Sequence, residues 1–139
     1  MKEDSIFHLI RTVEQFNDKS IIEFTKSFKG DIGIAQILVL NVLSENGAMK
    51  QANLAQKLGY SKGGITHITT KLIQKGYAQR KYDEEDRRII LITITDGGKK
   101  ILQEAEQTGK ELRQKMYAVL SQEEVESLTT ITEKMLHAL

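Results

Sequence analysis

Apolar side chains recur at helical spacing through most of the chain, and glycines stand where the runs end. The pattern predicts a long first helix over 5–28 and a second over about 34–44, closed by Asn46-Gly47. A short third helix over about 51–58 ends at Gly59, because glycine adopts the left-handed conformation of a helix end without steric cost. The apolar residues of the second helix are expected to be nearly all buried: Ile37, Leu38, Leu40, Val42 and Leu43.

The residues after Gly59 predict a fourth helix and, with it, a helix-turn-helix. Ser61 is a good N-cap for a helix that reaches Lys75 and is closed by Gly76. A turn of three or four residues that contains glycine therefore joins the third helix to the fourth, and this is the helix-turn-helix arrangement.

The spacing of apolar residues then changes from helical to alternating. Residues 77–82 and 88–95 predict two strands, and the acidic residues 83–86 predict the polar turn between them. A β-hairpin directly after a helix-turn-helix predicts a winged helix. Beyond it, Thr95 or Asp96 caps a fifth helix to about Leu120, and a capping box at 121–124 opens a sixth. The expected fold is mainly α with a small β-hairpin wing.

The terminal helices carry more apolar surface than a lobe of roughly 60 residues can cover. In the last two helices the apolar residues are Leu112, Met116, Val119, Leu120, Leu128, Ile131, Met135, Leu136 and Leu139. These helices could fold back onto their own subunit, but helices of this length would overreach so small a lobe. We therefore expect the long N- and C-terminal helices to join two copies of the chain.

Composition excludes several classes of protein. With 139 residues, 40% of them hydrophobic, the chain is expected to fold as one domain. The absence of cysteine excludes disulfides, cysteine-ligated metals and a thiol nucleophile. No apolar run approaches the ~18 residues of a membrane-spanning helix, and no signal-peptide pattern is present, so a cytoplasmic protein with no membrane contact is expected.

Charge is distributed unevenly along a chain whose net charge is only +1. Residues 46–82 contain seven basic side chains and no aspartate or glutamate, although the chain has 19 acidic residues. Such a stretch is typical of a surface that meets a polyanion, and a solvated face that merely lacks carboxylates is the simpler alternative. The near-neutral net charge favours a contact through one defined surface over non-specific attraction by a protein that is basic all over.

The two faces of the predicted fourth helix differ sharply. One face collects the residues expected in the core, which are Ile65, Ile68, Thr69, Leu72 and Ile73. The other face collects small residues, hydroxyls and an imidazole: Gly63, Thr66, His67, Thr70 and Gln74, with Lys71 at its edge. Surface helices usually expose long charged groups, so this composition favours close approach to a ligand.

Duplex DNA is the polyanion that such a face fits. The side chains able to reach base edges in the major groove are Thr66, His67, Thr70, Lys71 and Gln74. Ser61, Lys62 and Thr66 also suit phosphates, and Gly63 and Gly64 allow the backbone at the helix start to come close to a phosphate or base. His67 could equally be an ordinary surface residue. The three histidines are far apart in sequence, so no metal ion is expected.

The predicted hairpin tip places two arginines beside four carboxylates. Arg87 and Arg88 follow directly after residues 83–86, and an arginine at this position can enter the minor groove of DNA. Asp86 can pair with Arg88 and hold its guanidinium in one orientation. A solubilising turn would explain the acidic residues equally well, but it would not explain the adjacent arginines.

Two stretches resemble the MarR family of bacterial winged-helix transcription regulators. One is Asp86-Arg87-Arg88 followed by Ile92-Thr93-Ile94-Thr95 and Gly98, and the other runs from Leu54 to Lys62 and continues with Ile65-Thr66 and Leu72. The resemblance covers essentially the whole chain. It departs from the family pattern at His67, where arginine is frequent, at Thr70, where an acidic or amide residue is frequent, and at Glu84, where proline is usual.

The resemblance implies a single MarR-like domain over 1–139. Within it we expect a winged helix-turn-helix DNA-binding lobe over about 34–98 and a helical dimerisation region over about 1–30 and 99–139. It also implies a homodimer joined through its first, fifth and sixth helices, with the fourth helices in successive major grooves of a pseudo-palindrome and Arg88 in a minor groove. Members of the family are commonly repressors that are released by a small phenolic or anionic ligand.

The leading hypothesis is therefore a ligand-responsive, sequence-specific repressor that binds double-stranded DNA as a homodimer. The alternative is a winged-helix interaction module whose basic face contacts an acidic protein partner. An enzyme is not expected, because the chain lacks a thiol nucleophile, a paired histidine and carboxylate, a phosphate-binding glycine loop and a G-x-S-x-G turn. No cofactor is expected.

Overall fold

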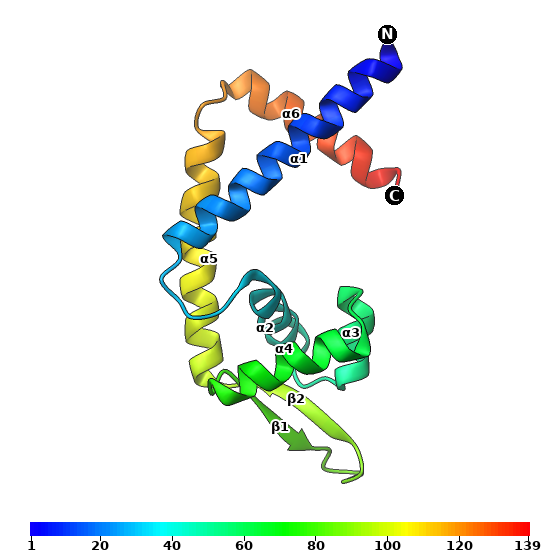
Figure 1. Ribbon diagram of the computed structural model, residues 1–139, viewed down its shortest axis with the longest axis vertical. Helices are drawn as coiled ribbons and strands as arrows, with labels where there is room; N and C mark the ends of the chain where they lie inside the picture. The colour runs from blue at the N-terminus through cyan, green and yellow to red at the C-terminus, as the bar shows by residue number, and fades with distance from the viewer. The chain divides into compact units, whose positions relative to one another are not determined.

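The computed structural model describes residues 1–139 and contains six helices and one two-stranded antiparallel sheet (Figure 1). The elements are α1 (Lys2–Ser27), α2 (Ile34–Asn46), α3 (Gln51–Leu58), α4 (Lys62–Gln74), β1 (Ala78–Tyr82), β2 (Ile90–Ile94), α5 (Asp96–Tyr117) and α6 (Gln122–His137). The predicted fold class, mainly α with a β-hairpin wing, is confirmed.

The chain divides into two compact units, each considered by itself below. The first combines Met1–Phe24 with Gln107–Leu139, and the second is Thr25–Glu106. The second unit contains the helix-turn-helix and the hairpin, and it extends beyond 34–98 at both ends. At its carboxyl end it takes in the first turns of α5, because the side chains of Ile101, Leu102 and Ala105 are buried.

The core of the winged-helix unit is formed by apolar residues from α2, α3, α4 and β2. Its largest fully buried side chains are Val39, Leu40, Leu43, Leu54, Ile65, Thr69, Leu72 and Ile92. One expectation about α2 is wrong: Leu38 is 42% exposed, whereas Val39 is completely buried. At 100° per residue, Leu38 lies well to one side of the direction in which Val39, Leu40 and Leu43 point.

Thr95 links the residues that follow α4 to the start of α5. The Thr95 hydroxyl donates to the carbonyl oxygen of Gly76 over 2.6 Å and accepts from the backbone N–H of Gly98 over 3.0 Å. A Cβ at Gly98 would stand only 2.1 Å from the carbonyl oxygen of Tyr77, so the close approach of these backbones requires glycine. The Tyr77 hydroxyl donates to Asp31 over 2.7 Å and thereby lowers the pKa of that carboxyl.

The other unit consists of helices that bury very little. Neither α1 nor α6 contains a buried residue, although both carry many apolar side chains. Phe16 and Tyr117 place their ring centroids 6.2 Å apart, joining α1 to α5. Ser121 opens α6 with the predicted capping box, in which its hydroxyl and Glu124 exchange hydrogen bonds with each other's backbone N–H groups. No helix of the chain combines the length and apolarity needed to cross a membrane.

Candidate nucleic-acid interface

The amino-terminal turn of α4 is capped, free of carboxylates and open to approach. Ser61 accepts a hydrogen bond from the backbone N–H of Gly64 over 3.0 Å, and no acidic residue lies in the first turn. Gly63 is exposed, and a Cβ added to it would meet no atom within 4 Å. Unpaired N–H groups at a helix start attract anions, so this turn is suited to a phosphate.

One exposed face of α4 brings together the residues singled out by the sequence. Thr66, His67, Lys71 and Gln74 are exposed and Thr70 is half-buried, while Ile65, Thr69 and Leu72 are buried on the other side. The exposed and buried faces of α4 therefore follow the helical spacing used to predict them. No acidic side chain projects from α4.

Gln51 is a residue of this region that sequence reasoning missed. It begins α3, and its side-chain amide bonds to two threonines of α4. Its Nε2 donates to the Thr66 hydroxyl over 2.7 Å, and its Oε1 accepts from the Thr69 hydroxyl over 3.1 Å. These partners are 15 and 18 residues away, so no local spacing could have indicated the contact.

The hairpin tip contains a bidentate ion pair. Arg88 donates from Nε and Nη2 to the two carboxylate oxygens of Asp86, each over 3.0 Å, and its backbone N–H donates to Asp86 over 3.1 Å. The hydrogen bonds from Arg88 lower the pKa of the Asp86 carboxyl, and the same contact raises the pKa of Arg88. The Arg88 side chain is nonetheless 91% exposed, so the pair orients the guanidinium and leaves it accessible.

The same contact explains why β2 begins later than the alternation of residues predicts. Asp86 accepts from the backbone N–H of Arg88, and its carbonyl oxygen accepts from Ile89, so both residues belong to the turn and the strand starts at Ile90. Arg87, also in the turn, is exposed and has no ion-pair partner in the chain. Both arginines are therefore presented at the end of the hairpin.

Not every cation of the basic stretch is free to meet a ligand. Lys75 contacts the backbone carbonyl of Asp31, and its ammonium lies 3.7 Å from the carboxylate of the same residue. The other basic residues of 46–82 form no ion pair, so the positive charge of the region is reduced but not cancelled. The chain holds no cluster of three or more histidine, aspartate or glutamate side chains arranged for a metal ion.

Comparison with known proteins agrees with this arrangement. A model of the MarR family matches residues 32–90. The HTH-type transcriptional regulator YpoP of Bacillus subtilis is 33% identical over 72% of this chain and 71% of its own length. The chain belongs to the MarR family. Proteins of this family are DNA-binding transcription regulators and not enzymes.

Two further relatives extend the likeness beyond the winged helix. The multiple antibiotic resistance protein MarR of Escherichia coli is 29% identical over 92% of this chain and 88% of its own length. A crystal structure of an E. coli MarR variant complexed with operator DNA has a TM-score of 0.77 and 27% identity, covering 96% of each chain. The chain spans 62–88% of the length of the curated relatives that it matches.

Gly63 offers a test in which folding and DNA binding respond in opposite directions. Gly63→Ala is expected to stabilise α4 by up to about 1 kcal/mol, because alanine is the better helix former and its methyl group meets no atom of the protein. The same methyl group is expected to weaken DNA binding by filling the space into which a phosphate or base would come. Urea denaturation and fluorescence anisotropy with a DNA duplex measure the two effects. Equal or tighter DNA binding would remove Gly63 from the interface.

Proposed function

We propose that this MarR-family protein is a homodimeric, sequence-specific repressor that binds a pseudo-palindromic operator. The observation that carries the proposal is the exposed face of α4, which joins hydroxyl, imidazole, amide and ammonium groups in a stretch without a single carboxylate. The major groove displays a distinct set of donors, acceptors and methyl groups for each base pair, and these side chains are suited to reading it.

The α4 residues divide by position into two groups. Ser61, Lys62 and the backbone at Gly63 and Gly64 surround the helix start, where contacts to phosphate fix the register of a helix on DNA. The residues farther along the exposed face, proposed to reach base edges, are Thr66, His67, Thr70, Lys71 and Gln74. At the hairpin tip, Arg88, oriented by Asp86, is proposed to enter a minor groove, with Arg87 beside it.

We infer the dimer from apolar helix faces that no other part of the same chain covers. Along α6 the exposed apolar side chains Leu128, Ile131 and Met135 are 42%, 55% and 55% exposed and lie on one stripe at helical spacing. Most of the stability of a helix in a protein comes from packing of its apolar face against another surface. A second copy of the same chain supplies a matching apolar surface, because a two-fold interface uses the same patch twice.

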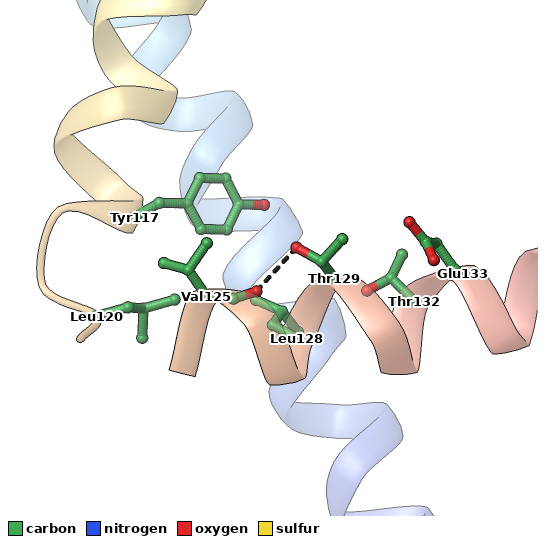
Figure 2. A pocket seen from close by; sticks show the side chains of 7 residues that line it. All are labelled: Tyr117, Leu120, Val125, Leu128, Thr129, Thr132 and Glu133. Atoms are coloured by element: carbon green, nitrogen blue, oxygen red, sulfur yellow. Dashed lines mark hydrogen bonds between the residues drawn. The ribbon is translucent and has the colours of Figure 1, made fainter. Parts of the chain in front are cut away.

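A groove at the turn between α5 and α6 belongs to this surface. It has a volume of about 490 Å³ and is lined by Tyr117, Leu120, Val125, Leu128, Thr129, Thr132 and Glu133 (Figure 2). The Thr129 hydroxyl donates to the carbonyl oxygen of Val125 over 2.8 Å, so it is directed back to its own helix. Most of the groove surface is apolar, and we assign the groove to side chains of the second copy.

Release by a small phenolic or anionic ligand, implied by the family resemblance, completes the proposal, and the cytoplasm is the expected location.

The sequence alone suggested a different partner as well, an acidic protein on the same basic face. A true DNA surface should bind even random duplexes weakly, whereas a surface shaped for an acidic protein should not. Competition by random genomic fragments therefore separates the two functions.

Salt provides the direct test of the DNA contact. Affinity for an operator duplex is expected to fall by at least about 100-fold between 50 and 200 mM salt, because neutralised phosphates release their counterions. The operator is obtained first, by sequencing the genomic fragments that the purified protein retains. Fluorescence anisotropy at several salt concentrations then gives the slope. An affinity that does not change with salt would contradict the proposed function.

A further inference from the structure

The hydroxyl hydrogen of Thr66 is used inside the protein. Thr66 Oγ1 donates to the carbonyl oxygen of Lys62 over 2.8 Å and accepts from Gln51 Nε2 over 2.7 Å. Because a hydroxyl has one hydrogen, none is left for an outside partner. If the oxygen and nitrogen of the Gln51 amide exchanged places, that hydrogen would be shared between two acceptors and would still point inward.

Gln51 is held firmly enough to impose this geometry. Its side-chain amide lies 3.1 Å from the hydroxyl oxygen of Thr69, a completely buried residue whose hydroxyl also reaches the carbonyl oxygen of Ile65 over 2.9 Å. The amide bonds to Thr69 in either orientation, because its oxygen can accept from that hydroxyl and its nitrogen can donate to it. Two residues earlier, Met49 pairs with Ile92 of β2 through two backbone hydrogen bonds of 2.9 and 2.7 Å. Both the side chain and the preceding backbone of Gln51 are thus fixed to the core elements that carry α4 and the hairpin.

Thr70, one turn farther along the exposed face, is different. Its side chain is half-buried, and its hydroxyl forms no hydrogen bond within the chain. It can therefore donate as well as accept. The two threonines of one face, identical in chemistry, are consequently prepared to recognise different groups.

We propose that Gln51 is a positioning residue that makes Thr66 read DNA as a hydrogen-bond acceptor and methyl group, never as a donor. The proposal rests on the proposed function of α4. In the major groove the partners of an acceptor are the amino groups of cytosine and adenine, and a methyl group packs on the methyl of thymine. Phosphate oxygens accept hydrogen bonds and do not donate them. Thr66 is therefore assigned to a base edge, and the phosphate role considered from the sequence passes to Ser61 and Lys62.

The test is the base preference at each position of the operator, measured with a library of randomised duplexes for the full-length protein. Thr66→Val keeps the methyl group and removes the acceptor, so the preference for an amino-bearing base is expected to fall by about 3- to 10-fold at one base pair. Thr66→Ser keeps the acceptor and is expected to retain that preference. Gln51→Met, which removes the amide at similar length, is expected to broaden the preference at the same base pair.

Two further variants separate positioning from folding. Thr69→Val preserves the buried shape and removes the hydrogen bond between Thr69 and Gln51. It is therefore expected to broaden the base preference at the same base pair as Gln51→Met does. Thr70→Val is the matched control and is expected to change the base preference at a different base pair. An unchanged preference profile in both Gln51→Met and Thr69→Val, with wild-type binding intact, would overturn the inference. Failure of the wild-type protein to bind any duplex would instead overturn the proposed function.

Discussion

Ile131→Asp is expected to convert the protein to a monomer and to lower operator affinity by roughly 1,000-fold, close to non-specific binding. Ile131 lies in the middle of the exposed apolar stripe of α6 and is 55% exposed. In a two-fold interface the substitution would bury two unpaired carboxylates, each at a cost of several kcal/mol. Sedimentation velocity reports the association state, and fluorescence anisotropy reports the affinity.

The neighbouring residue supplies the control. Thr130→Asp introduces the same charge one position earlier, where the side chain points to the polar side of α6 and the Thr130 hydroxyl bonds back to its own helix. This variant is expected to sediment as a dimer and to bind the operator normally. If Ile131→Asp also sediments as a dimer, the apolar stripe of α6 is not the contact between the two copies.

Arg88→Ala is expected to weaken operator binding by about 10- to 100-fold without changing the fold or the association state. The Arg88 side chain is 91% exposed, so its removal is expected to leave the structure intact. The expected loss corresponds to the proposed minor-groove contact in each half of the operator. Anisotropy with the operator duplex measures the affinity, and circular dichroism with sedimentation confirms that the rest of the molecule is unchanged.

Asp86→Asn distinguishes an oriented arginine from a merely nearby one. The change removes a negative charge next to DNA, so simple electrostatics predicts tighter binding. Loss of the bidentate ion pair frees the guanidinium to sample other orientations, so the proposed role of Asp86 predicts weaker binding. Asparagine keeps an oxygen for the backbone N–H of Arg88 and therefore preserves the turn. Tighter binding by this variant would show that Asp86 does not position Arg88.

Features determined by neighbouring residues could be predicted from the sequence, and features determined by distant contacts could not. Ser61 caps α4 as predicted because the cap needs only the next three residues. The Asp86–Arg88 ion pair was also predictable, since its partners are two residues apart. The ion pair of Lys75 was not predictable, because its partner, Asp31, lies 44 residues away.

The candidate site shows the same division. Helical spacing was sufficient to place His67, Thr70 and Lys71 on one exposed face, because the inner face of α4 is decided by a few apolar residues. The hydrogen bonding of the Thr66 hydroxyl was not predictable, since it depends on a glutamine at the start of another helix. Which groups share the exposed face of α4 follows from periodicity, but whether each group donates or accepts a hydrogen bond follows from tertiary structure.

The two helices without a buried residue, α1 and α6, also determine when the molecule becomes stable. If the apolar faces of α1 and α6 are covered only by a second copy, folding is completed only when two chains associate. The fraction of fully folded protein then depends on the concentration of the chain in the cell. At low abundance, unassembled chains would expose long apolar helices and be removed by proteases. A regulator built in this way would have a lifetime that rises with its own expression, so newly made protein would accumulate slowly at first and more rapidly later.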